Sequence, residues 1–127
     1  MNNCFIILAA GESKRFNSRV PKPYFIYRNK PLLLHSIDRA KYFNKFNKIL
    51  VVINKKHINL IKKLKIKKIK IIVGGKTRAE SALKALKSIK NQNIKRVMIH
   101  DAARPDFSLK LLAKLDKELK SHDCVIP

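Results

Sequence analysis

Short apolar runs alternate with longer amphipathic stretches along the chain. The apolar runs hold β-branched, aromatic and aliphatic residues and predict strands over residues 4–8, 49–53, 69–73 and 97–99. Residues 4–8 are typical of a buried parallel strand, and a last buried strand is expected to start at Cys124. Between them, apolar residues recur at helical spacing over residues 32–43, 55–65 and 78–89. Thr77 and Glu80 have the spacing of a capping box, and Ser108 can cap a final helix. The alternation predicts an α/β fold with three layers around a mostly parallel sheet.

The length of 127 residues predicts a single domain over residues 1–127, and 46% hydrophobic residues suffice for a core. The last apolar run has no continuation, so we expect an incomplete domain from a longer protein. No apolar run approaches the ~18 residues of a membrane span, and the N-terminus lacks a signal-peptide pattern. We therefore expect a cytoplasmic location and no membrane partner. Cys4 and Cys124 both read as buried thiols in a reducing compartment, with no disulfide or metal pairing.

The net charge of +22 has two explanations. One is binding to the phosphate backbone of a nucleic acid. The other is compositional drift, because the excess consists of 23 lysines against 7 arginines, and lysine, isoleucine and asparagine all have AT-rich codons. The lysines are scattered over every predicted helix, and the densest run, at residues 62–68, fits a solvated helix end and loop. The pattern favours drift and makes a nucleic-acid partner unlikely.

Small and charged residues gather in three loops that follow predicted strands, at residues 9–23, 74–78 and 100–106. In parallel sheets, ligands bind beyond the carboxyl ends of the strands. The first loop offers the small residues Ala9, Ala10 and Gly11, followed by the cations Arg15 and Lys22, which suits a nucleoside triphosphate. A tight turn with surface cations remains the alternative, because neither the dinucleotide-binding fingerprint nor the P-loop pattern is present.

The second and third loops carry further candidates. Gly74 and Gly75 permit close approach of the backbone to a flat ligand, and Ser81 would point its hydroxyl near the same place; a plain turn into a capped helix is the alternative. Asp101, directly after a predicted central strand, suits a Mg²⁺ ligand, since Mg²⁺ takes one or two carboxylates, waters and substrate phosphates. Alternatively, Asp101 caps a turn and pairs with Arg104.

Taken in order, these residues resemble the 2-C-methyl-D-erythritol 4-phosphate cytidylyltransferase family. The resemblance rests on Ala-Ala-Gly at residues 9–11 with Arg15, Pro-Lys at residues 21–22, Gly-Gly at residues 74–75 with Arg78 and Ser81, and His-Asp-Ala-Ala-Arg-Pro at residues 100–105. It implies a Rossmann-like nucleotidyltransferase fold and a reaction in which methylerythritol phosphate attacks the α-phosphorus of CTP. The chain would be the N-terminal portion of a family member or of a longer, bifunctional chain.

The resemblance also implies a role for each residue. Arg15 and Lys22 would neutralise the triphosphate and the transition state, and Asp101 would hold Mg²⁺. Arg104 would support its loop. The other matched residues would contact the cytosine and ribose: Ala9, Ala10, Gly11, Gly74, Gly75, Arg78, Ser81 and Ala102. Lys76 departs from the family, which often has an acidic residue there, and Pro23 stands where Gln is common. A full-length relative would form a homodimer.

Three alternatives remain open from the sequence. The first is another nucleotidyltransferase of the same architecture, acting on ribitol phosphate or a sugar phosphate. The second is a basic nucleic-acid-binding module. The third is a fragment without activity of its own, because the segment that holds the acceptor in the family lies beyond residue 127.

Overall fold

The computed structural model describes residues 2–11 and 20–127, and the statements below concern that part of the chain. Its central sheet has four parallel strands in the order β5–β4–β1–β6, where β1 spans Asn3–Ala9, β4 Lys48–Ile53, β5 Lys70–Val73 and β6 Arg96–Asp101. The short strands β2 (Ile26–Tyr27) and β3 (Lys30–Pro31) form an antiparallel hairpin outside this sheet. The predicted parallel sheet is therefore confirmed.

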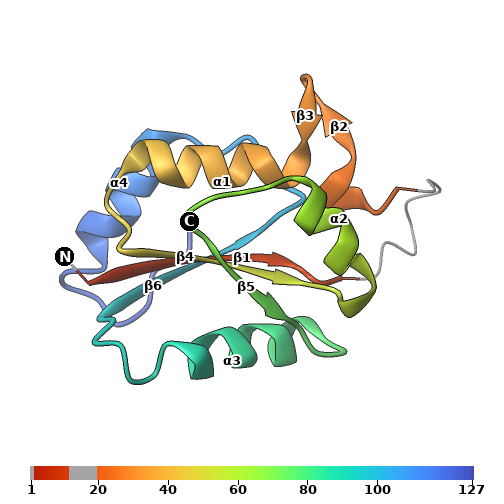
Figure 1. Cartoon of the computed structure of the whole chain (residues 1–127). Helices are drawn as coiled ribbons and strands as arrows, with labels where there is room; N and C mark the ends of the chain where they lie inside the picture. Colours follow the sequence, from red (N-terminus) through yellow and green to blue (C-terminus); the bar gives the residue numbers. More distant parts are fainter. Residues whose placement is uncertain (1, 12–19) are drawn as a thin grey trace.

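Helices cover both faces of the sheet (Figure 1). One face carries α1 (Leu32–Phe43), α2 (Ile58–Lys63) and α4 (Leu109–Glu118), and the other carries α3 (Arg78–Ser88). Two short 3-10 helices are present in the described residues: η1 at Lys22–Tyr24 precedes β2, and η2 at Lys55–His57 precedes α2. The predicted helix over residues 55–65 is thus shorter and begins with η2, because the Asn54 side chain caps this turn by accepting from the Lys56 amide at 3.0 Å.

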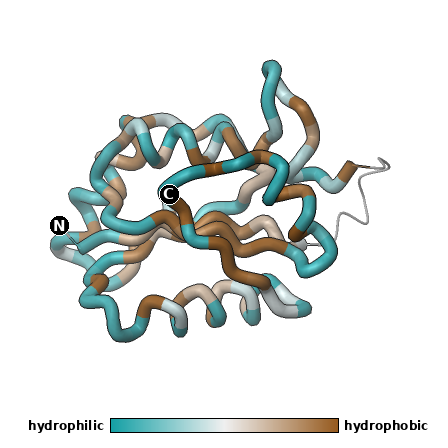
Figure 2. Tube along the Cα trace, viewed as in Figure 1, coloured by the Kyte–Doolittle hydropathy of each residue, from teal (hydrophilic) through white to brown (hydrophobic). Residues whose placement is uncertain are grey.

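The core lies on both sides of β1, whose seven residues are all buried. Alternate side chains point to opposite faces of a strand, so Phe5 and Ile7 pack beneath α1 and α4, whereas Cys4 and Ile6 pack against α3. Figure 2 shows this arrangement as a band of mostly hydrophobic strands between helices in which hydrophilic and hydrophobic residues alternate. Burial on both faces explains why β1 reads as a continuous apolar run.

Two caps fix the starts of the long helices that follow β5 and β6. Thr77 Oγ1 accepts from the Glu80 amide at 3.1 Å, and Ser108 Oγ accepts from the Leu111 amide at 3.0 Å, as the sequence predicted. The Glu80 carboxylate, however, accepts from the Lys76 amide at 2.8 Å rather than from the amide of Thr77. The cap of α3 therefore also holds the loop before it.

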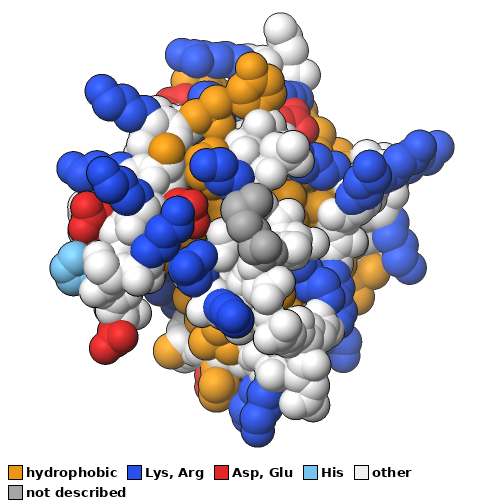
Figure 3. Space-filling view, turned by 90° about the vertical axis from the view of Figure 1, so that its left-hand side faces the viewer, with side chains coloured by type: hydrophobic (Ala, Val, Ile, Leu, Met, Phe, Trp, Pro, Cys, Tyr) orange, Lys and Arg blue, Asp and Glu red, His pale blue; other side chains and the backbone are white. Residues whose placement is uncertain are grey.

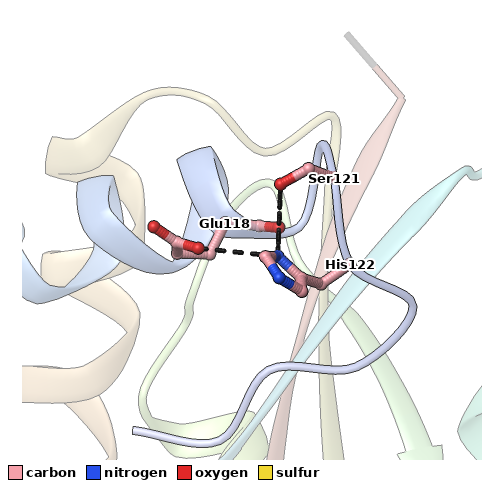
Figure 4. A network of polar contacts seen from close by, with 3 residues as sticks. All are labelled: Glu118, Ser121 and His122. Atoms are coloured by element: carbon pink, nitrogen blue, oxygen red, sulfur yellow. Dashed lines mark hydrogen bonds and ion pairs between the residues drawn. The ribbon is translucent and has the colours of Figure 1, made fainter.

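The C-terminal end of α4 is closed by Glu118, Ser121 and His122 (Figure 4). His122 Nδ1 lies 3.1 Å from the Ser121 hydroxyl, 3.1 Å from the Glu118 carbonyl oxygen and 3.5 Å from its carboxylate. Serine and carboxylate meet the same ring nitrogen, whereas a hydrolase triad needs them on opposite nitrogens. The cluster is a helix cap, not a catalytic site.

The predicted strand at Cys124 is wrong. Residues 124–127 form no regular element, Cys124 is exposed, and the segment runs along a groove between β6 and α4. A strand needs a hydrogen-bonded neighbour, and in the described part of the chain β6 pairs only with β1. The expectation that both cysteines are buried thus holds for Cys4 alone.

Lysine and arginine side chains are spread over the face drawn in Figure 3, with acidic side chains among them. This distribution agrees with the scattered lysines of the sequence and does not form a single basic stripe on that face. No helix in the described ranges combines the length and the apolar character that crossing a membrane requires.

Candidate active site at the carboxyl ends of the strands

The three loops singled out in the sequence meet in one pocket of about 370 Å³. The parallel register brings them together, because Leu8 pairs with Val52 on one side and with Asp101 on the other, so the strands end at the same edge. The described lining residues are Leu8, Ala10, Gly11, Lys22, Gly75, Lys76, Thr77, Arg78, Ser81, Asp101, Ala103 and Arg104. The predicted convergence of the loops is confirmed.

The first loop contributes small residues and one described cation. Ala10 is nearly buried and Gly11 is exposed at the pocket, and the Ala10 carbonyl accepts from the Asn54 side-chain amide at 3.3 Å. Lys22 reaches the pocket from the start of η1. Ala9 does not line the pocket, since it is packed in the core at 2% exposure. Arg15 lies outside the described residues.

The second loop is held tightly by the first turn of α3. The Gly75 amide donates to Ser81 Oγ at 3.1 Å, and the Lys76 amide donates to the Glu80 carboxylate at 2.8 Å. Gly74 sits behind the pocket, where an added Cβ would lie only 2.6 Å from the Ala10 Cβ. Ser81 is therefore a buried anchor that also faces the pocket, and Gly74 lets the first two loops approach each other.

The third loop places Asp101 and Arg104 at the pocket. Asp101 Oδ1 accepts from Arg78 Nε at 3.1 Å, so its ionic partner is Arg78 and not Arg104 as the alternative interpretation had it. The Arg104 amide closes the turn by donating to the Asp101 carbonyl at 3.1 Å. Ala102, which was expected at the ribose, is 1% exposed and donates its amide to Leu8, and Ala103 lines the pocket instead.

His100 stands behind this loop. Its ring packs against Phe5 and Phe107, with centroids 6.0 and 4.3 Å away, and its Nε2 is 2.6 Å from the Arg104 carbonyl oxygen. Burial lowers the pKa of His100 below 6.5, and the hydrogen bond to Arg104 and the charge of Asp101 oppose that shift. His100 is thus a packed residue near the carboxyl end of β6.

Charge in the pocket is strongly positive. Among the described lining residues, four are cations and Asp101 is the only carboxylate: Lys22, Lys76, Arg78 and Arg104. An anion that carries several phosphate groups complements such a site. Among residues 2–11 and 20–127, no group of three or more His, Cys, Asp or Glu side chains could hold a metal ion by itself.

Sequence reasoning did not single out several residues that shape the pocket. Asn54, which follows β4, gave no signal, because a lone Asn after a strand usually marks only a turn. Glu80 was identified as half of a capping box, and its contact with the Lys76 amide could not be foreseen from spacing. Ala103 lines the pocket beside the predicted Asp101 and Arg104. Lys76 and Thr77, which the sequence marked only as a departure from the family and as a helix cap, line the pocket as well.

Comparison with known proteins places this geometry in a family. The family model for 2-C-methyl-D-erythritol 4-phosphate cytidylyltransferase (IspD) matches residues 3–127. The chain is 75% identical over its full length to the bifunctional enzyme IspD/IspF of Pelagibacter ubique, covering 34% of that protein. It is 42% identical over 116 residues to the 2-C-methyl-D-erythritol 4-phosphate cytidylyltransferase of Wigglesworthia glossinidia brevipalpis, covering 88% of this chain and 49% of that one.

Solved structures agree with the sequence relatives. The bifunctional IspDF of Campylobacter jejuni superposes on the whole chain with a TM-score of 0.84 and 37% identity, covering 33% of that protein. The 4-diphosphocytidyl-2C-methyl-D-erythritol synthase of Anaerococcus prevotii gives a TM-score of 0.80 at 25% identity, covering 94% of this chain and 52% of that one. The chain thus spans between about a third and half of the relatives it matches. It belongs to the 2-C-methyl-D-erythritol 4-phosphate cytidylyltransferase family.

Proposed function

We propose that the chain forms the CTP-binding part of a cytidylyltransferase that transfers CMP from CTP to 2-C-methyl-D-erythritol 4-phosphate and releases pyrophosphate. The observation that carries the proposal is the single pocket in which the three loops meet, with four cations and one carboxylate among its described lining residues. Family membership supports the choice of CTP and of the acceptor. A polyphosphate chain complements the cations, and a flat base fits beside Ala10, Gly11 and Gly75.

In the transfer, an oxygen of the acceptor's phosphate forms a bond to the α-phosphorus of CTP. The bond from that phosphorus to the oxygen bridging to the β-phosphate breaks, and pyrophosphate leaves with the electron pair. Such a reaction needs alignment of the incoming and leaving oxygens and compensation of negative charge. We assign this compensation to Lys22 and to Arg15, with Arg104 adding positive charge in the pocket.

The remaining site residues bind or support. Ser81 and Gly75 are joined by a hydrogen bond and would face the cytosine together with Ala10 and Gly11. Buried Ala9 and Ala102 and half-buried Gly74 act through their small size, which allows the loops to pack closely, and not through contact with the nucleotide.

A divalent cation fits Asp101. Mg²⁺ accepts one carboxylate together with substrate phosphates and waters, and the pocket offers one carboxylate among cations that attract phosphates. When bound, the ion would draw negative charge from the phosphates of CTP. Arg78 fixes the Asp101 carboxylate by donating to Oδ1 at 3.1 Å. Arg78 thus orients the proposed metal ligand.

We further propose that residues 1–127 form one incomplete nucleotide-binding domain, that the full-length protein is a homodimer, and that it works in the cytoplasm. These proposals rest on the family and on the partial coverage of its longer members. Gel filtration coupled to light scattering of the full-length protein measures the oligomeric state, and a monomeric mass would contradict the dimer.

The direct test is pyrophosphate release by the full-length protein with CTP, Mg²⁺ and 2-C-methyl-D-erythritol 4-phosphate. Lys22→Ala should lower kcat/KM by about 10²-fold, as expected for loss of one preorganised charge near the transition state. The matched control is Lys87→Ala, an exposed lysine in the last turn of α3 that lies away from the pocket. Equal turnover with ribitol 5-phosphate, or equal losses for both lysine variants, would contradict the proposal.

A further inference from the structure

The loop that carries Asp101 and Arg104 into the pocket is held from behind by one side chain. His100 is the last residue before Asp101 and faces the core below α4, while Asp101 faces the pocket. Its Nε2 lies 2.6 Å from the Arg104 carbonyl oxygen. Because a carbonyl oxygen can only accept, Nε2 carries the proton in this contact.

We infer that His100 is a positioning residue, whose Nε2–H fixes the turn formed by residues 101–104 and thereby the pocket-facing side chains of Asp101 and Arg104. The inference rests on the proposed function of the pocket for its effect on catalysis, but the positioning itself is a property of the fold.

Two backbone hydrogen bonds define the turn, and the His100 side chain adds a third contact. The Ala102 amide donates to the Leu8 carbonyl at 2.9 Å, which extends the pairing of β6 with β1 by one step. The Arg104 amide donates to the Asp101 carbonyl at 3.1 Å. The carbonyl oxygen of Arg104 faces His100 and accepts from its Nε2.

The aromatic contacts explain why a histidine stands at this position. The ring packs on Phe107 with centroids 4.3 Å apart and on Phe5 with centroids 6.0 Å apart, both in the core cluster under α4. Phenylalanine could fill the same space but has no donor for the Arg104 carbonyl. A side-chain amide could donate to the Arg104 carbonyl but would not fill the space beside the Phe5 and Phe107 rings. Histidine supplies both the flat ring and the directed N–H.

The chain offers matched variants for this position. In His100→Gln, the side-chain nitrogen occupies nearly the place of the imidazole Nε2, so the donor to Arg104 is retained. In His100→Asn, the nitrogen falls near the place of Nδ1 and cannot reach that carbonyl. His100→Phe keeps the ring and removes the donor, and Phe107→Leu trims the stacking while leaving the donor in place.

Hydrogen exchange on the full-length protein tests the positioning without any activity. We expect His100→Phe and His100→Asn to speed exchange of the Ala102 and Arg104 amides by tenfold or more, whereas His100→Gln and Phe107→Leu leave them near the wild-type rate. Equal exchange in the wild type and His100→Phe would overturn the inference. So would equal acceleration in His100→Gln and His100→Asn, because then only the ring matters.

Kinetics then links the turn to catalysis. In the pyrophosphate-release assay, His100→Phe and His100→Asn should lose about tenfold in kcat/KM for CTP, and His100→Gln should recover most of that loss. A wild-type protein without transfer would count against the proposed function and leave the exchange result to decide the role of His100. An active wild type with no difference between His100→Gln and His100→Asn would overturn the role in catalysis.

Discussion

Replacing Gly74 with alanine should destabilise the fold and loosen the pocket at the same time. A Cβ at this position would lie 2.5 Å from Ser81 Oγ, 2.6 Å from the Ala10 Cβ and 3.0 Å from Val52 Cγ1. The Ser81 hydroxyl could rotate away, but the Ala10 Cβ is attached directly to the backbone that follows β1. Relief therefore requires the first and second loops to move apart.

The expected cost follows from overpacking in a closely packed region. Added methylenes in such places cost about 1–3 kcal/mol, and replacing a glycine returns about 0.4–1 kcal/mol through the unfolded chain. The middle of the two ranges gives an expected net loss of about 1.3 kcal/mol. Urea denaturation of the 127-residue chain measures this loss as a lower midpoint at unchanged slope. In the full-length protein, the same variant should raise KM for CTP, because both loops line the pocket proposed to bind the nucleotide.

Gly11→Ala is the matched control for stability. An added Cβ there meets nothing within 4 Å, and none of the three glycines has a positive φ, so alanine fits without strain. We expect Gly11→Ala to be neutral or slightly stabilising. If Gly74→Ala unfolds at the same urea concentration as the wild type, the inference that the first and second loops pack closely at Gly74 is wrong.

Three further predictions concern stability and reactivity. Asp116→Ala should cost about 1–3 kcal/mol, because the buried carboxylate accepts from the Asn3 side-chain amide at 3.2 Å, and Asp116→Asn should cost less; urea denaturation decides. A thiol reagent at pH 8 should label exposed Cys124 quickly and Cys4 only after unfolding, because burial raises the pKa of Cys4 to about 11; Cys124→Ser must abolish the fast phase. Burial lowers the pKa of His57 below 6.5, so the unfolded protein binds the His57 proton more readily than the folded protein. The free energy of unfolding should therefore fall as the pH drops below 6.5, and a His57→Gln variant with the same dependence on pH would refute this.

The sequence predicted the sheet well because both faces of its inner strands are buried. The short, continuous apolar runs at β1 and β4 are typical of strands buried on both faces. Thr77 and Ser108 marked helix starts because a cap forms between a side chain and a backbone amide only a few residues away. The run at Cys124 misled because an apolar stretch forms a strand only where a neighbour pairs with it, and pairing is not visible in the run itself.

The sequence predicted which loops form the site, but not which side chains contact one another within it. Small residues after three parallel strands pointed to one edge of the sheet, and the pocket lies there. Which cation meets Asp101 depends on how α3 is placed beside β6, so Arg78 was not foreseen as its partner. The contacts of Asn54 and His100 with loop carbonyls depend on three-dimensional packing, and residue spacing carries no trace of them.

The central claim is that the three loops together form a site for CTP. Amide NMR of the isotope-labelled protein titrated with CTP and Mg²⁺ tests it most directly, with UTP as the matched control. The account predicts chemical-shift changes concentrated at Gly11, Gly75 and Asp101 and their neighbours, saturating at lower concentration for CTP than for UTP. Shifts spread over the surface lysines, with the same response to both nucleotides, would show that bulk charge binds the ligand and would contradict the claim.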